Sequence, residues 1–223
     1  MNLPTREECY ALFEEYKVPR NILMHCETVN KVGVFLAEQL KEKGVEVDVS
    51  LVDRLTLVHD LMKALVFEVK EEPEFKCFPS DEEIEFWREF SSRDDNKGKH
   101  DTELTASLFE EKYPEFASKI KLSADWKVLS NKKPIELQIE HYADWRVLID
   151  EVILLQKRID DLIVRYKDKI SLDGMDFWEK RVEVEKEVEK NIFEKLDFNA
   201  DELKERIESI GERISKRSGE NNG

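Results

Sequence analysis

Glycine, proline and cysteine are all scarce in this chain of 223 residues, which contains 7 Gly, 6 Pro and 3 Cys. So little glycine and proline excludes collagen-like and low-complexity chains. Cys9, Cys26 and Cys77 are an odd number of cysteines without close spacing, which argues against a disulfide framework and favours a reducing compartment.

Long apolar segments are also missing. No uncharged apolar run approaches the roughly 20 residues that are needed to span a bilayer. The N-terminal segment MNLPTREECY has neither the basic region nor the apolar region of a secretory leader. We therefore expect a cytoplasmic protein without a membrane partner.

The chain has fewer basic side chains (36) than acidic ones (51), and its formal net charge is -15. The resulting negative electrostatic field repels polyanions and makes a long nucleic acid an unfavourable partner. Hydrophobic residues make up 40% of the chain, which is enough to fill the core of a globular domain.

Apolar residues recur at helical intervals through most of the chain, and we expect an all-α fold. Helix boundaries are indicated by capping boxes, by prolines at helix starts and by a glycine at a helix end. These signals are the Thr5–Glu8 and Ser80–Glu83 capping boxes, Pro19, Pro114, Pro134 at a first helical position, Gly44, and Asp48 or Ser50 as the cap of a third helix.

The same patterns predict the organisation of the chain. The helical run from Pro134 is expected to reach Ile170 with a break near Asp150, and VEVDV at 45–49 is the nearest candidate for a strand. We expect one domain over 1–170, a helical extension over 171–217 and a disordered tail over 218–223. The extension is expected to pack on the domain or to form an oligomer contact, as in a homodimer.

Only four histidines are present, and two of them lie in unusual contexts. His59 and Asp60 are adjacent at the end of an apolar helix, DRLTLVHDLMK. Neighbouring helical residues point about 100° apart, so these two can share one ion only around a helix edge or end. A buried carboxylate beside a buried imidazole is costly unless a cation or a hydrogen bond compensates its charge.

Other helices must supply the rest of such a site. His25 lies among apolar neighbours in NILMHCETV, and Asp144 is a carboxylate in the apolar segment HYADWRV. With His59 and Asp60 they would provide two imidazoles and two carboxylates, a donor set suited to Mn, Fe, Co, Ni or Zn, with Mg as a further candidate. Such a set leaves coordination positions open, as metal-activated hydrolysis requires.

The order His25, then His59-Asp60, then Asp144 resembles the HD-domain superfamily of metal-dependent phosphohydrolases. The flanking segments VPRNILMHCETV, LVDRLTLVHDLMK and YADWRV are similar to the family's ligand helices, and the resemblance covers residues 1–170. It implies an HD-type helical bundle and hydrolysis of a phosphate ester or phosphodiester of a nucleotide or another small phosphorylated metabolite. The histidines that bind a second ion in dinuclear relatives are mostly lacking, which favours one metal ion over two.

The resemblance also implies roles for individual residues. Asp60 would orient or deprotonate the attacking water besides binding the metal, and Lys63 and His100 would neutralise charge on the phosphoryl group. The family pattern does not require His141, but its position three residues before Asp144 would let it approach the site, and we expect it in a supporting or surface role. Glu68, Glu71 and Glu72, in the loop after the HD helix, are candidates for the general acid.

Two alternatives stay open at the level of sequence. The polar residues could instead form a hydrogen-bonded buried network in a degenerate HD fold. The chain would then be a catalytically silent interaction module whose C-terminal helices dock a partner.

Overall fold

A computed structural model describes residues 1–66, 79–125, 134–167 and 175–209 of the chain. The prediction of an all-α fold is confirmed, since helices dominate these residues. In order, the helices are α1 (Arg6–Glu15), α2 (Arg20–Glu42), α3 (Val49–Val58), η1 (Lys63–Leu65), α4 (Asp81–Ser92), α5 (Asp101–Ser107), α6 (Pro114–Ser123), α8 (Ile135–Trp145), α9 (Leu155–Arg165), α11 (Met175–Phe193) and η2 (Ala200–Glu202), followed by helical residues 203–209.

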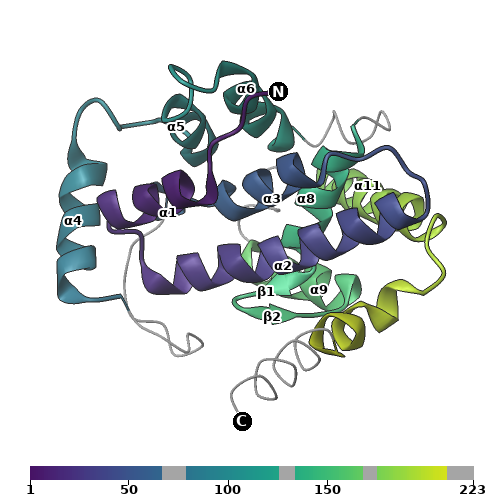
Figure 1. The fold of residues 1–223 in the computed structure, drawn as a ribbon. Coiled ribbons are helices and arrows are strands. Elements are labelled where there is room, and N and C mark those ends of the chain that lie inside the picture. Colours follow the sequence, from purple (N-terminus) through teal and green to yellow (C-terminus); the bar gives the residue numbers. More distant parts are fainter. Residues whose placement is uncertain (67–78, 126–133, 168–174, 210–223) are drawn as a thin grey trace, which may run out of the picture.

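The centre of the fold is the pair α2 and α3, which lie side by side and are joined by the short segment 43–48 (Figure 1). Gly33 permits their close approach, because a Cβ at this position would lie 2.6 Å from Cγ2 of Thr56. The side chain of Asn30 adds a polar connection by donating to Oγ1 of Thr56 and to the backbone carbonyl of Asp53. The relative placement of the two helices is therefore set by one small residue and one buried amide.

Helix α8 lies against both α2 and α3 and also contacts α6, α9 and α11. Nearly all of its residues from Leu137 to Trp145 are buried, because neighbours surround it. A helix buried on several sides can hold polar side chains only where each has a partner or a ligand.

Several of the helix boundaries expected from sequence are found. Thr5 and Ser80 both form complete capping boxes, and Gly44 adopts a φ of +81° after α2. Asp48, rather than Ser50, caps α3 by accepting a hydrogen bond from the backbone N–H of Leu51. Pro134 precedes α8 as its N-cap instead of occupying the first helical position.

Residues 45–48, part of the nearest candidate for a strand, form neither helix nor strand, and Val49 already belongs to α3. The break expected near Asp150 is found, but it begins earlier than expected. The helix after Pro134 ends at Trp145, and a two-stranded antiparallel hairpin, β1 (Val147–Leu148) and β2 (Glu151–Val152), follows before α9 begins. Val147 and Val152 are both buried, and their spacing would allow burial in a helix as well as in a hairpin. The apolar periodicity alone could therefore not distinguish a helix from a hairpin here.

Helix α11, in the first part of the C-terminal extension, packs against α8. Its side chains Trp178, Val188 and Ile192 are buried there, so the apolar stripe of the extension is used within the chain. Residues 210–223, which include the expected tail, lie outside the described residues, as do Glu68, Glu71 and Glu72. No helix among the described residues combines the length and the apolar character that crossing a membrane would require.

Candidate metal centre

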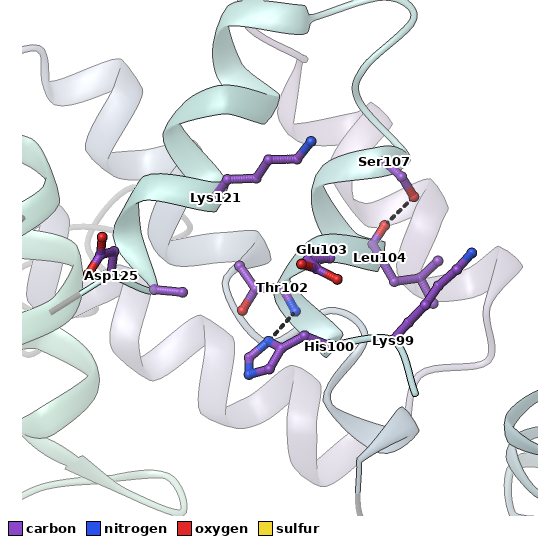
Figure 2. A pocket seen from close by; sticks show the side chains of 9 residues that line it. Lys99, His100, Thr102, Glu103, Leu104, Ser107, Lys121 and Asp125 are labelled. Atoms are coloured by element: carbon purple, nitrogen blue, oxygen red, sulfur yellow. Dashed lines mark hydrogen bonds between the residues drawn. The ribbon is translucent and has the colours of Figure 1, made fainter. Parts of the chain in front are cut away.

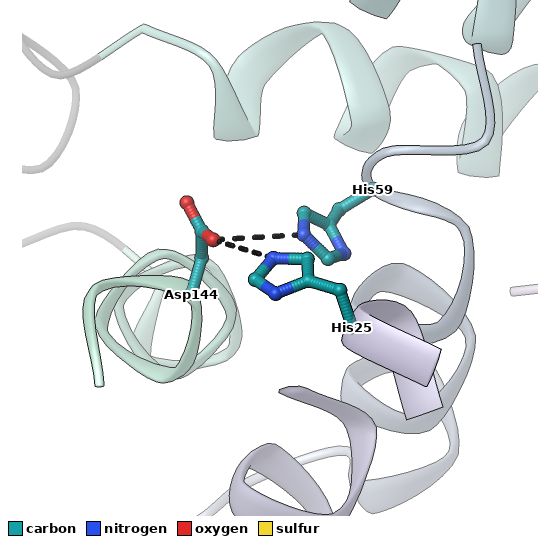
Figure 3. A group of neighbouring side chains, drawn as sticks. All are labelled: His25, His59 and Asp144. Carbon is teal, nitrogen blue, oxygen red and sulfur yellow. Dashed lines mark hydrogen bonds and ion pairs between the residues drawn. The ribbon is translucent and has the colours of Figure 1, made fainter. Parts of the chain in front are cut away.

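Three of the predicted metal ligands converge from three different helices. His25 lies on α2, His59 directly follows α3, and Asp144 lies near the end of α8. Their ligand atoms all lie within 4.8 Å of one another (Figure 3). Nε2 of His25 is 3.1 Å and Nε2 of His59 is 3.7 Å from Oδ1 of Asp144.

Both imidazoles are oriented by backbone carbonyls. Nδ1 of His25 lies 2.8 Å from the carbonyl oxygen of Ile149, and Nδ1 of His59 lies 2.9 Å from that of Thr56. A carbonyl can only accept, so in each ring Nδ1 carries the proton and donates it. In the neutral form each Nε2 therefore presents a lone pair, and both lone pairs face the carboxylate of Asp144.

The carbonyl partner of His25 comes from a strained turn. Ile149 sits between β1 and β2 with a φ of +60°, in the left-handed region that β-branched residues rarely adopt. Such strain persists only where the surrounding structure maintains it, and it is concentrated at functional sites. Here the turn brings the Ile149 carbonyl to His25, so the hairpin helps to fix the orientation of this imidazole.

Asp60 completes the group from the turn after α3. Its Oδ2 lies 3.7 Å from Nε2 of His59 and 4.0 Å from Nε2 of His25. Its Oδ1 accepts a hydrogen bond from Nζ of Lys63 at 3.2 Å. One oxygen of Asp60 thus faces the two imidazoles and the other is held by the lysine.

The electrostatics of the group favour positive charge at its centre. Burial lowers the pKa of His59, but the negative charge of Asp60 and the nearby carboxylate of Asp144 outweigh burial and raise this pKa well above its usual value. Burial raises the pKa of Asp144, yet the hydrogen bond with His25 and the nearby imidazole of His59 bring it well below its usual range. A proton on Nε2 of the imidazoles, or a cation in its place, satisfies this arrangement.

The residues fit a divalent cation. Nε2 of His59 is buried and has no hydrogen-bond partner among the described residues, although two carboxylates lie 3.7 Å away. Ligand atoms that are each about 2.1 Å from one ion are separated by about 3–4 Å, which matches the spacings of Asp144 and of Asp60 from the two imidazoles. Among the described residues, only His25, His59 and Asp144 have ligand atoms that all lie within 4.8 Å of one another. Two imidazoles and two carboxylates suit a first-row transition metal, and Asp144, about a third exposed, leaves access for water.

Lys63 and His100, the other two predicted site residues, occupy different positions. Lys63 begins η1 and contacts Asp60 directly. His100 is the N-cap of α5, as expected, but its side chain is 65% exposed and it is not one of the three clustered residues. It lines a cavity of about 680 Å³ between α5 and α6, together with Lys99, Thr102 and Lys121 (Figure 2).

Sequence reasoning missed Asp101, which is more closely tied to the site than His100. The Asp101 side chain is buried, and its Oδ2 lies 3.4 Å from Nζ of Lys63. Acidic residues commonly occupy the first turn of a helix, and this chain is rich in them. Nothing in the sequence therefore indicates that Asp101 contacts Lys63.

Sequence reasoning also missed Glu140, which lies one helical turn before Asp144. Its side chain is buried, and its Oε2 has no hydrogen-bond partner among the described residues. Burial raises the pKa of Glu140 to about 7, although the positive charges of His59 and His141 act in the opposite direction. The i, i+4 spacing from Asp144 was the available signal, since it places both carboxyl groups on one face of α8.

His141 belongs to a separate cluster. Its Nε2 lies 2.5 Å from Oε1 of Glu185 on α11, and both side chains are buried. Of the supporting or surface role expected for His141, the surface position is wrong, because the side chain is buried and joins α11 to α8.

Comparison of this chain with family models, with curated proteins and with solved structures finds no match. The interpretation of the site therefore depends on its own geometry and chemistry.

Proposed function

We propose that the protein is a metal-dependent phosphohydrolase of the HD type. The observation that carries the proposal is the pair of imidazoles whose Nδ1 atoms donate to the carbonyls of Ile149 and Thr56, so that both Nε2 lone pairs face carboxylate oxygens. Lone pairs and anionic oxygens that face one another need a proton or a cation between them. His25, His59, Asp60 and Asp144 would hold one divalent transition-metal ion, with Mg as the hard-ion alternative.

A bound divalent cation supplies a Lewis acid for the phosphoryl oxygen and lowers the pKa of bound water towards neutrality. Asp60 would orient the attacking water and accept its proton at a carboxylate oxygen. Lys63 would donate hydrogen bonds to the phosphoryl group and so stabilise its developing negative charge. His100, on the wall of the neighbouring cavity, would contact a more distant phosphate or leaving group.

The proposed substrate is a small phosphorylated metabolite such as a nucleotide. The net charge of -15 repels a long polyanion, whereas Lys63 and the cation would make the site itself locally positive.

Two measurements test the proposal. Elemental analysis of purified protein should find a stoichiometric transition metal, and a panel of nucleotides, cyclic nucleotides and sugar phosphates should show hydrolysis with added Mn or Co. The Asp60→Asn variant keeps the shape of the side chain and should lose most of this activity. A protein that takes up no metal, or that binds metal and hydrolyses nothing on the panel, would contradict the proposal.

The alternative of a silent interaction module has less support from the fold. It expected the C-terminal helices to dock a partner, and the apolar side chains Trp178, Val188 and Ile192 of α11 are buried within the chain instead.

A further inference from the structure

The ammonium group of Lys63 lies between two carboxylates that come from different parts of the chain. Its Nζ is 3.2 Å from Oδ1 of Asp60 and 3.4 Å from Oδ2 of Asp101. The Asp101 side chain is 7% exposed, that of Asp60 is 18% exposed and that of Lys63 is 36% exposed. The lysine is therefore shared between two largely buried acids, while part of it remains open to solvent.

Asp101 is held in place independently of Lys63. It is the first residue of α5, which packs against η1, and its Oδ1 accepts a hydrogen bond from the backbone N–H of Thr102 at 3.0 Å. Nδ1 of His100 lies 2.7 Å from the same oxygen. The carboxylate is thus anchored through one oxygen and presents the other to the lysine.

We propose that Asp101 is a positioning residue for the metal centre, because it shares the ammonium group of Lys63 with Asp60. This inference rests on the proposed metal-dependent function. An ammonium group has three N–H donors, and among the described residues Lys63 gives one of them to Asp60 in a hydrogen bond while it forms an ion pair with Asp101, so it can still donate to an oxygen of a phosphate. Asp60 in turn keeps Oδ2 for the cation, because only its Oδ1 is bound to the lysine.

The consequence of removing Asp101 follows from charge. Without the second carboxylate, Lys63 would pair with Asp60 alone and would offset more of its negative charge. A divalent cation would then compete with the ammonium group for Asp60, and its affinity would fall. The effect should disappear when Lys63 itself is absent.

The test is a set of metal titrations by calorimetry, with Mn and Zn as probes, on the full chain after removal of bound metal. Asp101→Asn should weaken metal binding by about 10-fold, in the range found for residues that orient metal ligands. Glu103→Gln is the matched control, because it removes the same charge from an exposed position on the same helix and should change the affinity little. Circular dichroism confirms that each variant is folded.

The Lys63→Met background separates positioning from a general effect of charge. In that background Asp101→Asn should weaken metal binding no more than Glu103→Gln does. An equal loss in both backgrounds, or an unchanged affinity of Asp101→Asn alone, would overturn the positioning role while leaving the proposed function intact. A wild-type protein that binds neither probe would overturn both.

Discussion

Two histidine–carboxylate contacts lie three residues apart on α8, and their surroundings differ. At Asp144, the carboxylate meets two imidazoles from other helices, both with Nδ1 committed to backbone carbonyls, and a second carboxylate lies nearby. At His141, one imidazole meets one carboxylate, Glu185 of α11. The first arrangement concentrates lone pairs and negative charge on one point, whereas the second neutralises one charge with another.

A buried His–carboxylate contact does not by itself indicate a metal site. Convergence of several donors and backbone control of the Nδ1 proton are what distinguish the two regions. We accordingly name the two regions the proposed metal centre (His25, His59, Asp60 and Asp144) and the interhelix pair (His141 and Glu185).

We expect the largest difference between the two regions when substitutions in each are compared for their effect on metal affinity. His25→Ala removes one of the four proposed ligands and should weaken binding of Mn or Zn by more than about 100-fold, beyond the effect typical of residues that only orient ligands. His141→Ala should leave the affinity nearly unchanged, because this residue faces α11. Calorimetric titration measures both, and equal losses would abolish the distinction.

For the free energy of unfolding, we expect the substitution in the interhelix pair to have the larger effect. His141→Ala leaves the fully buried Glu185 without its partner, and we expect a loss of about 3 kcal/mol in the free energy of unfolding. Replacing both residues by Leu should recover much of this loss, since no buried charge then remains. Urea denaturation of the metal-free proteins tests this, and a double variant no more stable than His141→Ala would contradict it.

The two regions should also respond to pH in opposite directions. Burial lowers the pKa of His141, but the charge of Glu185 raises it above the usual value overall. The stability that this pair contributes is therefore full below the unfolded-state pKa of about 6.5 and is lost as the pH rises through the higher folded-state value. The difference in unfolding free energy between the wild type and His141→Ala should shrink over that range.

Metal binding should instead strengthen with rising pH, because a proton must leave His59, whose pKa is raised in the metal-free protein. Calorimetric titrations at several pH values measure this trend. Affinity that is constant across the range would show that no proton is released from the imidazoles.

The smallest effect concerns the strained turn beside the proposed metal centre. Ile149→Gly relieves a left-handed conformation that costs roughly 1–2 kcal/mol and adds a backbone entropy cost of about 0.5–1 kcal/mol. We expect a small net gain in stability and an unchanged metal affinity, because the carbonyl that binds His25 is retained. Leu148→Gly is the control and should lower stability, and a marked loss of metal affinity in Ile149→Gly would show that the side chain matters as well.

Much of the fold could be predicted from the sequence because helix signals are local. The capping boxes at Thr5 and Ser80 and the stop at Gly44 depend on residues within one turn of the boundary. The hairpin at 147–152 was missed because its strands are two residues long, too short for a period of two to be recognised.

The residue pattern predicts the helical character of the chain and identifies two histidines and two carboxylates in apolar contexts as candidates. The packing of the helices brings His25, His59 and Asp144 together. It also places the carbonyls of Ile149 and Thr56 against the two rings and Asp101 beside Lys63. The reason is physical: a backbone carbonyl is the same group at every residue, and a contact between distant helices depends on how they pack. Residue type reveals which side chains can bind a metal, but packing decides which of them face one another.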